Sequence, residues 1–341
     1  MSNGICKLTG TTGKFINAHI IPAALTRPEV KGEPFVTAGN GNRPRRQFSS
    51  WTDRELVTQE GEDILTALDT WAIDVLRKNK MVWSGWGTMS ALPNHKTEQS
   101  SYELFVPESG WGIRSVKGID FNRLRLFFLS LLWRAAASNR PEFADVSLPD
   151  EHVSELRRMI VEGDPKSYCF YPITLSQLST RGNTHNQTPI KSSWNVSVSG
   201  VSDRTQHVFR FYFDGLIVFF HIGEFTEGQV DKWYGKTAVA FADELACTAV
   251  TYERSFQREN LQMIMREAAQ RWPVDFTKLT FGVDTVNQDK AAIVPEHSTT
   301  ASGKISRQKS ETGNGEPPVS KRTGLSTLIL DAWKSVIRKV G

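Results

Sequence analysis

The chain has 341 residues, 39% of them hydrophobic and 23% charged, and its formal net charge is +4 at pH 7. Such values are typical of a soluble globular protein with enough length for a buried core, and they argue against a membrane protein or a disordered chain. The modest charge permits nucleic-acid binding without requiring it, because a local cluster of Arg and Lys matters more than the sum.

The cysteines predict a reducing environment. Cys6, Cys169 and Cys247 lie far apart in the chain and form no disulfide framework. No apolar run approaches the roughly 20 residues that a membrane helix needs, and the polar first residues predict no signal peptide. We therefore expect a cytoplasmic protein that makes no membrane contact.

The first informative stretch is residues 6–22, CKLTGTTGKFINAHIIP. Gly10 and Gly13 lie between two short β-prone runs, which is typical of a hairpin. The second run begins at Phe15 and places His19 at its far end, just before a proline. The stretch therefore predicts a β-hairpin that presents a histidine.

Residues 27–50 are rich in Gly, Pro and Arg and include the run GNGNRPRR. This composition predicts a long loop and argues against a helix or strand interior. Its Arg43, Arg45 and Arg46 are candidates to contact the phosphate backbone of DNA, with the glycines allowing close approach. The alternative is a solvated basic loop with no partner.

Apolar residues at helical spacing predict four helices further along the chain, at residues 53–80, 121–138, 149–162 and 252–272. Gly61 weakens the first of them and marks where its regular part begins. Residues 81–86, MVWSGW, predict a packed strand or turn against that helix, and residues 87–101 predict a polar loop.

The later part of the chain has β character. Residues 193–199 alternate apolar and polar side chains, and residues 208–213 and 216–221 flank an Asp-Gly pair, a strong hairpin signal. Residues 287–323 are polar and predict a disordered linker. Residues 324–341 predict an amphipathic helix that docks on its own body, on a second copy or on a protein partner.

The hairpin, the segment LVTQEGE, the run VWSGW and the later segment FFLSLLWRAAASNRPEF together resemble an uncharacterised bacterial type of the ββα-metal (HNH) endonuclease family that carries Ser-His-Ile-Ile-Pro. Three sequence features resemble the family as a whole. They are the His-Ile-Ile-Pro run at His19, the spacing Cys6-x-x-Thr9, and the spacing Thr58-x-x-Gly61 followed by an acidic residue. Many members hold a zinc ion with two Cys-x-x-Cys pairs at these two places. Here one of the four cysteines is present, so we expect no structural zinc.

The resemblance assigns roles to two residues. His19 corresponds to the general base that activates water, and Glu62 to a ligand of a catalytic Mg²⁺ or Mn²⁺. Ala18 stands where members often carry an Asp or His ligand. The alternatives are a buried histidine that orders the turn, and an exposed carboxylate in the first turn of a helix. Arg134, in a buried-looking helix, either reaches a phosphate or pairs with a core carboxylate.

We therefore expect an α+β protein whose regions are listed here in chain order: an HNH-like ββα unit at 1–86, a helical region at 87–165, an antiparallel β-rich region with a flanking helix at 166–286, the linker at 287–323 and the docking helix at 324–341. The expected function is metal-dependent cleavage of DNA, in defence against foreign or phage nucleic acid. The alternative is an inactive HNH-fold scaffold that binds nucleic acid or protein. The chain carries no phosphate-binding P-loop, no Gly-x-Ser-x-Gly elbow and no His-Glu-x-x-His motif.

Overall fold

The computed structural model describes residues 2–26, 35–39, 42–47, 50–106, 109–198, 201–239 and 243–271. Residues 1–276 form one compact unit, and the second unit, residues 277–341, lies outside the described residues. The linker expected at 287–323 and the docking helix expected at 324–341 therefore also lie outside them. No helix in the described part is both long enough and apolar enough to cross a membrane.

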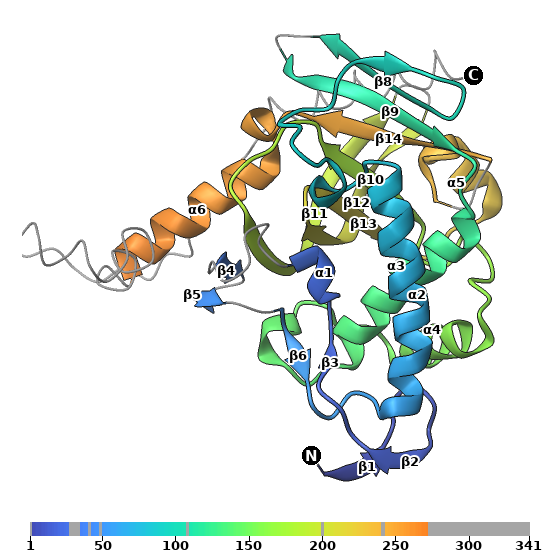
Figure 1. Cartoon of the computed structure of the whole chain (residues 1–341). Coiled ribbons are helices and arrows are strands. Elements are labelled where there is room, and N and C mark those ends of the chain that lie inside the picture. The colour runs from blue at the N-terminus through green and yellow to red at the C-terminus, as the bar shows by residue number, and fades with distance from the viewer. Residues whose placement is uncertain are drawn as a thin grey trace, which may run out of the picture. The chain divides into compact units, whose positions relative to one another are not determined.

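The protein is a mixed α+β structure (Figure 1). The strands are β1 (Asn3–Ile5), β2 (Thr12–Lys14), β3 (Ala18–His19), β4 (Phe35–Gly39), β5 (Asn42–Gln47), β6 (Thr52–Asp53), β7 (His95–Lys96), β8 (Ser100–Val106), β9 (Trp111–Lys117), β10 (Ile173–Leu178), β11 (His185–Val198), β12 (Val201–Phe213), β13 (Leu216–Ile222) and β14 (Glu244–Val250). The α-helices are α1 (Ala23–Thr26), α2 (Gln59–Lys78), α3 (Phe121–Ala137), α4 (Asp150–Glu162), α5 (Glu227–Trp233) and α6 (Phe256–Arg271). Short 3-10 turns η1 (Trp83–Gly85), η3 (Pro141–Phe143), η4 (Gly235–Thr237) and η5 (Tyr252–Arg254) complete the described elements.

A ten-stranded sheet runs in the order β5-β4-β11-β12-β13-β10-β14-β9-β8-β7. It is antiparallel except where β10 pairs with β14 and β4 pairs with β11. The hairpin predicted around Asp214-Gly215 is confirmed, because β12 and β13 pair in antiparallel register up to Phe213 and Leu216. Both turn residues have a positive φ, which Asp and Gly tolerate better than most residues.

Helix α3 lies at the centre of the core. Its side chains are buried on nearly all sides, as its apolar sequence predicts, and it packs against α2 and α4 (Figure 1). One hydrophobic cluster joins Ile20 and Ile21, near the candidate histidine, to α3 and to Phe211 and Phe220 of the sheet. The N-terminal elements therefore share their core with the sheet.

Three stretches differ from the sequence expectation. The predicted loop at 27–50 contains the antiparallel pair β4 and β5. Because β5 pairs only with β4, it is a sheet edge, and an edge strand tolerates a proline that has no N–H to donate. Residues 87–101, predicted as a polar loop, contain β7 and the first residues of β8, and the sheet strands β8 and β9 were missed.

The helix predicted from residue 53 begins later, at Gln59. Asp53 instead belongs to β6, where its carboxylate accepts hydrogen bonds from the Glu55 amide and the Ser138 hydroxyl at 2.8 and 2.6 Å. Thr58 is the residue that precedes the first helical turn. The chain thus forms a short strand before the helix, which the helical periodicity alone did not show.

Candidate functional site

His19 lies at the end of β3, which pairs in antiparallel register with β6, and α2 follows β6 in the chain. His19 stands opposite Thr52, and Ala18 stands opposite Asp53. The next amide, that of Ile20, donates to the Trp51 carbonyl at 3.0 Å. The order of elements around the predicted base is therefore strand, strand, helix, with the segment 20–51 inserted between the two strands.

Glu62 lies in the first turn of α2 and is partly buried. Burial raises the pKa of its carboxyl above the ordinary value, the positive charge of Arg134 opposes that rise, and the negative charges of Asp69 and Asp63 add to it. Asp69 follows Glu62 by two helical turns, so the two residues lie on the same face of α2. The predicted metal ligand therefore belongs to a small charged cluster.

Arg134 of α3 is at the centre of this cluster. Its guanidinium donates to both carboxylate oxygens of Asp69, at 2.9 and 2.5 Å, and to the Ser130 hydroxyl at 3.2 Å. It also donates to the main-chain carbonyl of His19 at 3.4 Å. The Arg134 side chain is 1% exposed and that of Asp69 is 17% exposed. Of the two roles left open by the sequence, pairing with a core carboxylate is confirmed.

Thr9, Thr58 and Gly61, the three other positions that the sequence resemblance predicts to match zinc cysteines, lie around the Sγ of Cys6. The Thr9 amide donates to this sulfur at 3.4 Å. A Cβ added to Gly61 would lie 2.7 Å from it. Burial raises the pKa of the Cys6 thiol, but hydrogen bonds from Thr9 and Thr58 outweigh burial, so the pKa is below its ordinary value. Two threonines and a glycine thus occupy the space beside the one thiol.

The predicted phosphate contacts Arg43, Arg45 and Arg46 belong to the edge strand β5. Their side chains lie outside the described part of the chain, so the prediction stays untested.

The described residues contain no group of three or more His, Cys, Asp and Glu side chains arranged to hold a metal ion. Mg²⁺ is commonly held by one or two carboxylates together with water and substrate phosphates, and Glu62 at the start of α2 is one such carboxylate.

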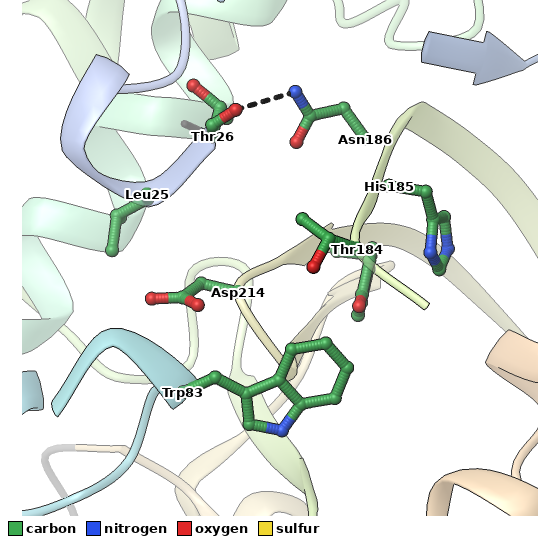
Figure 2. Close-up of a pocket in the computed structure, with 8 residues that line it drawn as sticks. Leu25, Thr26, Trp83, Thr184, His185, Asn186 and Asp214 are labelled. Carbon is green, nitrogen blue, oxygen red and sulfur yellow. Dashed lines mark hydrogen bonds between the residues drawn. The ribbon is translucent and has the colours of Figure 1, made fainter. Parts of the chain in front are cut away.

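A small pocket lies elsewhere, between α1, η1, the start of β11 and the tip of the β12–β13 hairpin (Figure 2). Its volume is about 20 Å³, enough for one water molecule. Asp214 accepts hydrogen bonds from the Ser84 amide, and burial raises its pKa to about 6. The Tyr212 hydroxyl is buried, which raises its pKa, and the Gly215 main chain beside it opposes that rise. The pocket is too small for a substrate, so it does not compete with the site at His19.

His185 also lines this pocket, and it is buried. Its Nδ1 lies 2.7 Å from the Asn183 carbonyl and its Nε2 lies 2.9 Å from the Gln257 amide nitrogen. Burial lowers its pKa to about 4, so the ring is neutral near pH 7 and donates through Nδ1 while accepting through Nε2. These contacts give His185 a structural role.

Sequence reasoning missed Asp69, although its place two helical turns after Glu62 was visible in the sequence. It had no way to show that Asp69 meets Arg134, which is 65 residues away in the chain.

Comparisons of the chain with protein-family models, with curated proteins and with solved structures give no significant match.

Proposed function

We propose that the chain is a metal-dependent endonuclease of the HNH-like, ββα-metal type that hydrolyses phosphodiester bonds of DNA. The observation that carries the proposal is the meeting of Cys6, Thr9, Thr58 and Gly61 at one point beside the start of α2. The family pattern places two Cys-x-x-Cys pairs at these positions, and here the two segments meet in space although they lie about 50 residues apart in the chain.

The order of elements gives independent support. In the ββα-metal arrangement, a histidine at the end of the first strand faces the helix that follows the second strand. Here β3 carries His19, β6 is its partner and α2 follows. In the proposed reaction His19 takes a proton from the water that attacks phosphorus, the bond from phosphorus to the leaving nucleotide oxygen breaks, and Glu62 would hold the Mg²⁺. The ion supplies Lewis-acid stabilisation of the charge that develops on the phosphate.

Basic residues of β5 provide the expected contact with the DNA backbone. Arg43, Arg45 and Arg46 lie in the segment inserted between the two strands of the proposed nuclease unit. Each such contact with a phosphate strengthens binding of any sequence and makes it sensitive to salt. A role against foreign or phage DNA follows from the resemblance alone.

A second candidate function, an inactive scaffold that binds nucleic acid or protein, is favoured by one observation. Arg134 holds the Asp69 carboxylate in a two-bond ion pair, so this carboxylate is engaged by a protein cation. Ala18, which precedes the candidate base, offers no ligand atom. A scaffold of this kind would keep the shape of the unit while having lost its chemistry.

Nicking of supercoiled plasmid DNA separates the two functions. The intact chain with Mg²⁺ or Mn²⁺ is compared with His19→Ala, with Glu62→Gln and with His207→Ala, an exposed histidine of β12 that serves as the matched control. We expect metal-dependent nicking that falls by about 100-fold or more in His19→Ala, because loss of a general base typically costs that much, and that survives in His207→Ala. Absence of nicking by the intact, folded chain would reject the nuclease in favour of the scaffold, and equal nicking by His19→Ala would reject His19 as the general base.

A further inference from the structure

We propose that Arg134 is a positioning residue: it bonds both Asp69 of α2 and the main chain at His19, and so holds His19 at a fixed place relative to α2. This inference rests on the proposed function. Arg134 is the residue through which three separate elements meet. It belongs to α3, it pairs with Asp69 of α2, and it donates to the main chain of β3 at His19.

The geometry of the contact limits how far the three elements can move. Two parallel hydrogen bonds to Asp69 fix the plane of the guanidinium, and the bond to the Ser130 hydroxyl adds a third restraint from its own helix. The Nη1 atom that bonds Asp69 is also the atom that reaches the His19 carbonyl. A shift of β3 relative to α2 would therefore have to break or distort the same set of bonds.

The strand that carries His19 needs such a restraint. β3 is two residues long and its only ladder pairs are those of Ala18 and His19 with β6, within the described strands. So short a strand pair is weakly held by its own hydrogen bonds. Catalytic geometry is sensitive at this scale, since a displacement of about 1 Å can cost about 100-fold in rate. A side chain that ties β3 to the helix carrying Glu62 would control that distance.

Helix α3 offers a matched comparison in Arg125. It too is fully buried, and it donates to the carbonyls of Pro165, Ser167 and Phe170. These carbonyls belong to the segment after α4, and none belongs to a residue of the candidate site. Arg125 therefore has the same burial and the same helix as Arg134 but no contact with β3 or α2 among its recorded bonds.

The test replaces the pair as a unit. A buried ion pair exchanged for apolar side chains of similar size usually leaves folding intact, whereas removal of one partner does not. We therefore expect the double variant Arg134→Met with Asp69→Leu to stay folded, to bind DNA with unchanged affinity and to nick it at least 10-fold more slowly at saturating DNA. Arg134→Lys should fall between this variant and the intact chain. Arg125→Met should lower the melting temperature without slowing nicking by folded protein.

A second readout does not depend on catalysis. The Ile20 amide, which bonds Trp51 beside His19, should exchange its hydrogen faster in the double variant than in Arg125→Met. A folded double variant with unchanged nicking and unchanged exchange would overturn the proposal and make the pair purely structural. If the intact chain nicks no DNA, the proposed function fails, and the exchange at Ile20 alone decides the positioning role.

Discussion

Gly61→Ala is expected to destabilise the protein, although an alanine normally stabilises a helix relative to glycine by about 1 kcal/mol. The added Cβ would lie 2.7 Å from the Cys6 Sγ and 3.0 Å from the Val57 Cβ, and both distances are shorter than ordinary contact. Inserting a methyl group into a packed core costs about 1–3 kcal/mol. Subtracting the propensity gain of about 1 kcal/mol from this packing cost leaves a net loss of up to about 2 kcal/mol.

Urea denaturation of four variants, Gly61→Ala, Gly228→Ala, Cys6→Ala and the double variant Cys6→Ala with Gly61→Ala, measures this balance. Gly228→Ala is the matched control, because Gly228 is also in the first turn of a helix, α5, and an added Cβ meets no atom within 4 Å. It should stabilise the protein by up to about 1 kcal/mol. In a Cys6→Ala background the sulfur is gone, so Gly61→Ala should cost about 1–2 kcal/mol less than in the intact chain. The reasoning is refuted if Gly61→Ala stabilises the protein as much as Gly228→Ala does.

Three further outcomes are expected. Thr9→Cys, Thr58→Cys and Gly61→Cys together should create a tetrahedral thiolate site with the native thiol, seen as a Co²⁺ charge-transfer band; no band would weaken the family resemblance. Asp214 holds its proton better when folded, since burial raises its pKa from 3.8 to about 6. Protonated Asp214 therefore adds roughly 3 kcal/mol to the free energy of unfolding below pH 3.8, and this contribution is lost as the pH rises through about 6. Asp214→Asn should thus raise the unfolding free energy more at pH 8 than at pH 4, and an equal effect at both would contradict this. Tyr212→Phe should change stability by less than about 1 kcal/mol, because within the described residues its buried hydroxyl forms no hydrogen bond of good geometry; a larger loss in urea denaturation would reveal a bound water.

Much of the fold was predictable from local patterns. The hairpin at Asp214-Gly215 and the buried helix α3 each have a strong local cause, turn chemistry in one case and continuous apolar sequence in the other. The β4–β5 pair was missed because Gly, Pro and Arg disfavour strands in general but are tolerated at a sheet edge. Whether a segment is an edge depends on its partner, here β11, and a single sequence does not show that partner.

Some features of the candidate site were also predictable from local sequence, and others were not. His19 and Glu62 were predicted from the family resemblance. The positions that match the zinc cysteines, in two short segments, were predicted from the same resemblance. For the ion pair between Asp69 and Arg134, the sequence predicted that a buried arginine in α3 needs a partner, but it did not show that the partner is Asp69. Contacts between distant segments depend on how helices pack, and packing is a property of the whole core.

The long-range contacts of the N-terminal elements have a consequence for the order of events during synthesis. Arg134 meets His19 across 115 residues of chain, Arg157 meets the Leu8 carbonyl across 149, and Asn186 meets the Thr26 carbonyl across 160. The segment that carries the candidate base leaves the ribosome first, yet the groups that hold it follow much later. The nascent chain must therefore keep part of its apolar N-terminal segment exposed for several seconds, at about 5–20 residues per second, until these later groups have been made.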